Sequence, residues 1–245
     1  MSFDVDLITD ITKLVQHNLP SGRVYTAEDG SIPDDGYPSV TTVLSADKSK
    51  KDSIDAWRKR VGDVEADKVM HKASSTGTAV HLVMEDFILD QEPQTKHMPY
   101  VHSIADRLKK EIDGKIGKVR MVEGQLFSHH LRAAGTADLI AEFDGQLSII
   151  DWKTSKWNKD AASISSYFMQ LSAYAVMFEE RTGIPVPQLV IVMSGTNPDS
   201  PFSKVFIEKR DNWIGKFLEV RELYDSELSN NAQTEDGTSR GVSDS

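Results

Sequence analysis

The sequence predicts an α/β protein with a mixed central β-sheet flanked by helices and with a helical N-terminal region. Three observations predict this class. Apolar residues recur at helical spacing over 52–73, several β-branched segments follow one another over 119–153, and a helical pattern at 163–181 separates these from the buried strand "QLVIVMS". The predicted order of elements is helices, a meander of strands, a helix and then further strand. This order is typical of an α/β domain with a mixed sheet.

The first part of the chain is expected to be mostly helical. Residues 1–20 place apolar side chains on one helical face and end at a proline. The segment "SVTTVLS", residues 39–45, fits a helix start or a short strand equally well. A helix is predicted over 52–73 and a second over 78–89, with Ser, Thr and Gly at 75–77 as its N-cap.

The middle of the chain predicts a helix followed by a meander. A basic amphipathic helix runs from 99 to 114. Three strands are then predicted: 119–127, 135–143 and 146–153. The last two are joined by Asp144-Gly145, a strong signal for a two-residue hairpin.

The end of the chain predicts a helix over 163–181, strands in "QLVIVMS" and "KVFIEK", and a closing helix over 212–228. The remaining residues are small and polar without aromatics, which favours disorder. The predicted organisation is a helical N-terminal region over 1–76, a core over 77–228 and a disordered tail over 229–245.

Composition excludes several classes of site. The 245 residues include no cysteine, so a disulfide, a thiolate zinc site and an iron–sulfur cluster are ruled out. No stretch of ~20 apolar residues predicts a membrane span, and the acidic N-terminus does not predict a signal peptide; a cytoplasmic location is expected. The net charge of −10 argues against broad, nonspecific nucleic-acid adhesion. Bases concentrated over 105–120 leave a local basic surface.

Two charged residues stand inside an otherwise apolar strand, in "LIAEFDGQLSIIDWKTSK". Asp151 and Lys153 point to one face of the strand, and Trp152 points to the other. Counting outward from the hairpin turn places Asp138 beside Asp151. Two adjacent carboxylates repel unless a cation lies between them, and hard oxygen ligands suit Mg²⁺ or Mn²⁺. A lysine that merely neutralises two strand-end acids is an equally good explanation.

Other polar residues carry less information one by one. His81 and Glu85 are four residues apart on one predicted helical face, as are Gln170 and Tyr174 on another. Glu123 lies on the first strand of the meander. A lone histidine is more often structural or solvated than a ligand, and a Gln–Tyr pair is typical of a half-buried polar edge.

Four motifs together carry a resemblance. "GTAVHLVMEDF", "GTADL", "IIDWKTSK" and "QLSAY", from Gly77 to Tyr174, resemble in order and spacing the motifs of the RecB-like branch of the PD-(D/E)XK nuclease superfamily. The segment "YPSVTTVLS" with the Trp-bearing helix after it is similar to phage exonucleases related to the mitochondrial genome maintenance exonuclease. Ala137 replaces the proline of the superfamily name, while Gly135-x-x-Asp138 matches the RecB-like pattern.

The resemblance implies a restriction-endonuclease-like nuclease core over 77–228, an N-terminal region over 1–76 that could arch over a DNA strand, and a set of site residues. Metal ligands would be His81, Asp138, Asp151 and the Trp152 carbonyl. Lys153 would position the attacking water. Glu85 and Glu123 would act around the metal or hold a second one. DNA would be held by Gln170, Tyr174 and Thr154, with Trp57 and Tyr37 as candidates for base stacking.

The leading hypothesis is a metal-dependent DNA exonuclease that uses Mg²⁺ or Mn²⁺ and acts from single-stranded ends. The resemblance implies a role in phage DNA processing, replication or recombination in the host cytoplasm, with a single-strand annealing or replication protein as partner. The alternatives are a processive double-strand exonuclease feeding recombination and a nuclease-fold DNA-binding module without catalysis. A site-specific restriction endonuclease fits less well, because no separate specificity domain is seen. A generic acidic interaction protein is the remaining alternative.

Overall fold

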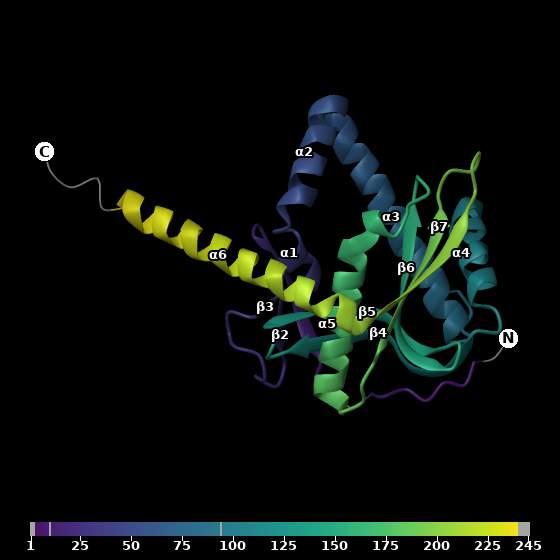
Figure 1. The fold of residues 1–245 in the computed structure, drawn as a ribbon. Helices are drawn as coiled ribbons and strands as arrows, with labels where there is room; N and C mark the ends of the chain where they lie inside the picture. The colour runs from purple at the N-terminus through teal and green to yellow at the C-terminus, as the bar shows by residue number, and fades with distance from the viewer. Residues whose placement is uncertain (1–2, 10, 94, 240–245) are drawn as a thin grey trace, which may run out of the picture.

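The centre of the computed structural model, which describes residues 3–9, 11–93 and 95–239, is a five-stranded sheet (Figure 1). Its strands are β4 (Ile116–Ser128), β5 (Ala133–Phe143), β6 (Gln146–Ser155), β7 (Gln188–Gly195) and β8 (Ser203–Lys209), in that spatial order. Neighbours run antiparallel except β6 and β7, which are parallel. The predicted mixed central sheet is confirmed.

The β5–β6 hairpin has the predicted turn and register. Asp144 and Gly145 both have positive φ, 51° and 80°, which is the backbone of the turn that best matches the twist of two antiparallel strands. Phe143 pairs with Gln146 and Leu139 with Ile150. The next position of the same register sets Asp138 beside Asp151.

Helices cover both faces of this sheet. Helix α5 (Ser165–Thr182) packs on one face, and α3 (Asp63–Ile88) and α4 (Pro99–Ile112) pack on the other. The short helices η1 (Ala162–Ile164) and η2 (Arg210–Asn212) adjoin α5 and α6 (Ile214–Ser239), respectively. Strand β6 alternates accordingly: Ile149 belongs to the core under α5, whereas Ile150 and Trp152 belong to the core under α3 and α4. Asp151 and Lys153 therefore lie on the α5 face, opposite to Trp152 as predicted.

The predicted helix over residues 1–20 is wrong. Residues 4–8 lie along the edge strand β4: Asp6 N donates to Val119 O at 3.0 Å and Ile8 N to Arg120 O at 2.9 Å. These bonds satisfy backbone groups that an edge strand would otherwise leave unpaired. Beyond it, a three-stranded antiparallel sheet forms from β1 (Leu14–Leu19), β2 (Gly22–Ala27) and β3 (Tyr37–Pro38).

The helices of the N-terminal half differ from prediction in where they break. After α1 (Val40–Leu44), which is capped by the Ser39 side chain, α2 (Lys48–Val61) and α3 are separated at Gly62, with φ of 86°. Helix α3 runs unbroken through 75–77, so the predicted cap and the boundary at 76/77 both lie inside one helix. Ser75 Oγ donates back to Lys72 O at 3.1 Å, a bond that a residue inside a helix makes.

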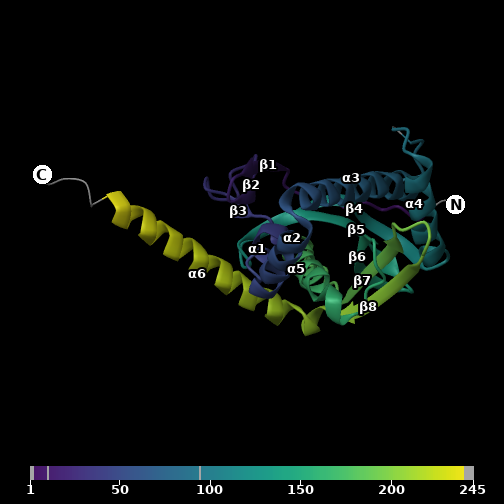
Figure 2. The ribbon, with the colours of Figure 1, turned by 90° about the horizontal axis from the view of Figure 1, so that it is seen from above.

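The C-terminal helix is longer than predicted. Helix α6 (Ile214–Ser239) continues past 228, so the first part of the predicted disordered tail is helical and the rest, 240–245, lies outside the described residues. Figures 1 and 2 show α6 extending away from the central sheet. Within the described part of the chain, no helix combines the length and apolar character needed to cross a bilayer.

Candidate active site

Three carboxylates line up across the central sheet. The residue pairs on either side of Glu123 and Asp138 are in register between β4 and β5, which sets these two residues opposite each other. The register of β5 with β6 continues the row to Asp151. Asp138 and Asp151 are buried, at 8% and 2% exposed. Glu123 has a φ of 47°, a left-handed backbone that costs a non-glycine residue about 1–2 kcal/mol.

His81 on α3 contacts this row of carboxylates. Its Nε2 lies 2.8 Å from Trp152 O, and because a carbonyl only accepts, Nε2 carries a hydrogen and donates it. The other ring nitrogen, Nδ1, is 3.4 Å from Asp138 Oδ2 and 3.8 Å from Glu123 Oε1. Ligand atoms of His81, Glu123 and Asp138 all lie within 4.8 Å of one another. This group could hold a metal ion.

The surroundings of His81 decide its charge. Burial by itself would lower the pKa of the imidazole, but the Asp138 and Glu123 carboxylates outweigh burial and raise the His81 pKa to about 11. Burial likewise opposes ionisation of Asp138, yet the adjacent His81 holds the Asp138 pKa below its ordinary value. In the metal-free protein the two therefore form an imidazolium–carboxylate pair.

Asp151 and Lys153 form a second pair in the same row. Lys153 Nζ is 2.5 Å from Asp151 Oδ2, but this contact lacks hydrogen-bond geometry, and the buried oxygen has no hydrogen-bond partner within the described residues. Burial raises the Asp151 pKa to about 6 even though Lys153 opposes the shift. Asp151 is thus an under-satisfied buried carboxylate. The structure groups Glu123, rather than Asp151, most closely with His81 and Asp138.

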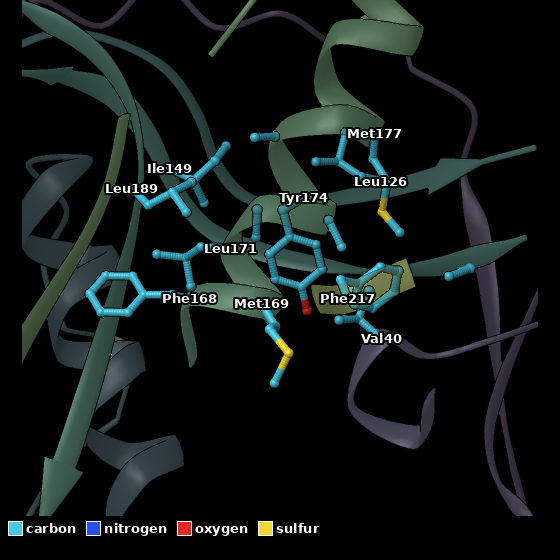
Figure 3. Packing of buried hydrophobic residues seen from close by; sticks show 14 of the residues in the cluster. Val40, Leu126, Ile149, Phe168, Met169, Leu171, Tyr174, Met177, Leu189 and Phe217 are labelled. Carbon is cyan, nitrogen blue, oxygen red and sulfur yellow. The ribbon is translucent and has the colours of Figure 1, made fainter. Parts of the chain in front are cut away.

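Helix α5 holds the ammonium of Lys153. Lys153 Nζ donates to Gln170 Oε1 at 3.3 Å, and Gln170 Nε2 donates to Tyr174 OH at 3.2 Å. Burial would lower the Lys153 pKa, but Asp151 and Asp138 outweigh it and raise that pKa, so the side chain is a cation. Tyr174 is 4% exposed and lies among the apolar residues of the core under α5 (Figure 3). The rigid core therefore fixes the position of the lysine.

Two adjoining cavities open onto the carboxylate row. One, of about 280 Å³, is lined by Asp138, Asp151, Lys153, Gln170 and Tyr174 together with residues of the N-terminal part. The other, of about 400 Å³, is lined by Gly77, Thr78, Leu82 and Glu85. His81 and Glu123 line both cavities. Burial and the nearby Glu123 raise the Glu85 pKa above its ordinary value.

Sequence reasoning missed one wall of the smaller cavity. It is lined also by Arg23, Tyr25, Ser39, Thr41 and Thr136. The first two belong to β2, in the region expected to end a helix and enter a loop. The segment "YPSVTTVLS" contains Ser39 and Thr41, so its family resemblance is the one sequence signal for this wall.

The predicted DNA-contacting residues fall in different places. Tyr37 is buried at 9% exposed, and its hydroxyl pairs with His129 Nδ1 at 2.9 Å; base stacking by its ring stays a prediction. Trp57 is half-buried on α2 and is not among the residues lining the two cavities. Thr154 lies beside Gly77, where a Cβ atom would be 3.8 Å from Thr154 Oγ1.

Comparisons with known proteins indicate the family of the chain. The family model for the PD-(D/E)XK nuclease superfamily matches residues 99–236. The human Mitochondrial genome maintenance exonuclease 1 is 24% identical over 215 residues, which cover 80% of this chain and 60% of that protein. The mouse protein of the same name is 29% identical over 130 residues, or 49% of this chain and 37% of that protein.

The chain spans less than two thirds of the length of these relatives. Among solved structures, SSO0001 superposes with a TM-score of 0.35 and 16% identity over 72% of this chain and 70% of that chain. That likeness is too low to support an argument about the site.

Proposed function

Because the chain belongs to the PD-(D/E)XK nuclease superfamily, we propose that it is a metal-dependent DNA exonuclease that hydrolyses phosphodiester bonds from single-stranded ends. The observation that carries the proposal is the grouping of His81, Glu123 and Asp138 beside the buried Asp151–Lys153 pair. We extend the proposal to Mg²⁺ or Mn²⁺ as the cofactor and to a role in phage DNA processing, replication or recombination.

The donor set fits a divalent cation. The site gathers more carboxylates than cations, namely those of Glu85, Glu123, Asp138 and Asp151 against the charges of Arg23, His81 and Lys153. The Oδ2 of Asp151, which accepts no hydrogen bond within the described residues although Lys153 Nζ lies 2.5 Å away, is a hard oxygen of the kind that Mg²⁺ and Mn²⁺ bind. The Trp152 carbonyl already accepts from His81 and retains one lone pair. A bound cation would supply Lewis-acid stabilisation of the charge that develops on the phosphate.

The protein's own residues would do the rest. The Lys153 ammonium, fixed by Gln170 and Asp151, would orient the attacking water and favour negative charge next to it. The Arg23 guanidinium, at the wall of the smaller cavity, would bind a phosphate oxygen of the strand. These two cations would accelerate hydrolysis to the extent that the negative charge near them is greater in the transition state than in the substrate.

The hairpin formed by α2 and the first half of α3 supports a strand-contacting role. Residues 48–75 contain eight Lys and Arg against five Asp and Glu, in a chain whose net charge is −10. Nearly all of them are exposed, and Figure 1 shows the two helices rising from the body of the molecule. A locally positive, solvent-exposed hairpin suits the phosphates of a single strand. Trp57 on α2 would then be available to it.

The test is degradation of end-labelled DNA by the purified chain in Mg²⁺, Mn²⁺ or EDTA. Linear single-stranded, circular single-stranded and blunt duplex substrates are compared. We expect metal-dependent loss of the linear single strand, with the circular strand intact and the duplex degraded more slowly. Circular DNA degraded at the rate of linear DNA would overturn the exonuclease assignment. A lack of cleavage with every metal would overturn the enzyme assignment.

A further inference from the structure

An exposed tryptophan lies just beyond the candidate active site. Trp157 is 68% exposed in the loop 156–161 that follows β6. The other tryptophans are more sheltered: Trp152 is 2% exposed, Trp57 is half-buried, and Trp213 stacks on Phe168. We propose that this loop binds the nucleic-acid strand next to the scissile phosphate, with the Trp157 indole stacking on an unpaired base. The inference rests on the proposed function.

The loop is fixed where it leaves the sheet. Ser155, which is 9% exposed, donates from Oγ to Trp157 O at 2.7 Å and accepts from Trp157 N at 3.3 Å. The same serine offers its backbone oxygen to Thr196 N at 2.9 Å. The indole is therefore presented from an ordered backbone four residues after Lys153. A backbone that is already ordered loses little further conformational entropy when its side chain stacks on a ligand.

A shared tyrosine connects the loop to the catalytic lysine. Lys153 Nζ and Lys159 Nζ each lie 5.0 Å from the centre of the Tyr167 ring. Lys159 Nζ also donates to the Tyr167 hydroxyl at 2.9 Å. The ammonium groups of Lys159 in the loop and of Lys153 at the candidate site thus lie near the same Tyr167 ring. A strand whose scissile phosphate lies at Lys153 would place a neighbouring nucleotide within reach of the loop.

Positive charge accompanies the exposed ring. Lys156 Nζ is 5.2 Å from the centre of the Trp157 ring. Lys204 Nζ donates to Lys159 O at 3.4 Å, which brings a further lysine to the base of the loop. Asp160, the acid of the loop, accepts a hydrogen bond from Ser163 N at 2.9 Å. Because the bonds from Ser163 lower the Asp160 pKa, its one negative charge remains and stands against the three lysines. In an acidic protein, such a lysine cluster creates a local positive field that attracts phosphate.

The chemistry selects an unpaired base. Every base has a π face, so stacking on an indole tolerates any sequence, but the face is open only when the base has left its duplex stack. The lysines contribute phosphate contacts that are independent of sequence. The loop would therefore favour single strands over duplex at the site itself. This deepens the proposed function by naming residues that carry the strand preference.

Binding is tested by fluorescence anisotropy with a labelled oligo(dT) strand and a blunt duplex in Ca²⁺, with strand integrity checked on a gel. We expect Trp157→Ala to weaken single-strand binding about tenfold, and duplex binding by less than about twofold. Trp157→Phe retains a stacking ring and should stay within about twofold of wild type. The control Leu228→Ala removes an exposed apolar side chain from α6 and should change neither affinity.

The lysines give a second readout. Each lysine that neutralises a phosphate displaces a counterion from the strand, so its removal makes binding less sensitive to salt. Replacing Lys156 or Lys159 by alanine should therefore make the plot of log affinity against log salt concentration less steep by about 0.7 for each phosphate that is no longer neutralised. Lys216→Ala on α6 is the matched control and should leave the slope unchanged.

The outcomes separate the two proposals. Wild-type cleavage in Mg²⁺ combined with unaltered oligonucleotide affinity in Trp157→Ala would overturn this inference and leave the nuclease proposal standing. A wild-type chain that neither binds nor cleaves the strand would overturn both. Circular dichroism of each variant confirms that altered binding does not arise from unfolding.

Discussion

Gly135 on β5 and Tyr174 on α5 are so close that no side chain fits between them. A Cβ atom at residue 135 would lie 2.8 Å from Tyr174 Cε1 and 2.9 Å from its hydroxyl. The glycine of the "GTADL" motif is therefore needed by packing: it lets the sheet approach the tyrosine that bonds Gln170, which in turn bonds Lys153. This close approach ties a backbone position to the placement of the Lys153 ammonium.

Gly135→Ala should cost about 1–3 kcal/mol of unfolding free energy, because the methyl group overpacks the core. Activity should fall as well, since the displaced tyrosine shifts Gln170. Urea unfolding and the end-labelled DNA assay measure the two effects. Gly215→Ala is the control: it lies in α6 with no described atom within 4 Å of the added Cβ, and should be neutral or stabilising by up to about 1 kcal/mol. Equal stabilities of Gly135→Ala and wild type would contradict the packing argument.

Lys153→Ala should lower the cleavage rate by about 10³-fold, because it removes the cation that faces the developing charge. Truncation also leaves the buried Asp151 without its ion pair, so Lys153→Gln, which keeps most of the length of the side chain, is measured beside it. Both variants should remain folded by circular dichroism and both should be inactive. A Lys153→Gln enzyme with wild-type rates would show that the ammonium is dispensable.

Mn²⁺ should raise the thermal stability of the wild-type chain, because a ligand that binds only the folded state stabilises it by mass action, by about 2.7 kcal/mol at a hundred times its dissociation constant. Asp138→Asn removes a carboxylate of the metal-binding group and should abolish most of this response. Asp106→Asn changes an exposed carboxylate on α4 and should respond as wild type does. The measurement is a thermal melt with and without Mn²⁺. A response in Asp138→Asn equal to that of wild type would place the metal elsewhere.

Metal binding should release a proton from His81. With its pKa raised to about 11, this imidazole is protonated in the metal-free protein at neutral pH, whereas a metal ligand must be neutral. The apparent Mn²⁺ affinity should therefore rise with pH by up to about tenfold per pH unit until the pH reaches the His81 pKa. Calorimetric titration in two buffers with different ionisation enthalpies counts the protons. Heats that do not depend on the buffer would refute the exchange.

The raised pKa of His81 also makes the stability of the metal-free protein depend on pH. The folded-state pKa of His81 lies above its ordinary value of 6.5, so the folded state binds the proton more tightly than the unfolded state does. This contribution to stability is complete below pH 6.5 and disappears as the pH rises through about 11. His81→Gln should lack it. Urea unfolding of the two metal-free proteins across that range measures the difference.

Local sequence signals determined the part of the site that lies on one hairpin. Asp144-Gly145 fixes a two-residue turn, and in antiparallel strands a fixed turn fixes the register. Asp138 therefore had to meet Asp151, and the two-residue period of a strand had to place Lys153 with Asp151 and Trp152 on the other face. The spacing of Gln170 and Tyr174 on one helix was likewise a local property. These relationships span few residues and need no knowledge of the rest of the chain.

The tertiary structure alone decided which distant groups complete the site. Glu123 meets Asp138 through a strand pairing whose register shifts at Val119 and Met121, and irregularities of that kind are not written in a hydrophobic pattern. The N-terminal segment lies along β4 rather than in a helix because the unpaired edge of β4 offers it hydrogen bonds that an isolated segment does not have. Arg23 reaches the cavity wall from β2 of the separate N-terminal sheet. The hydrophobic period of a strand and the residues of a turn are properties of short stretches of sequence. The pairing of a sheet edge and the walls of a cavity depend on segments that meet only after the chain has folded.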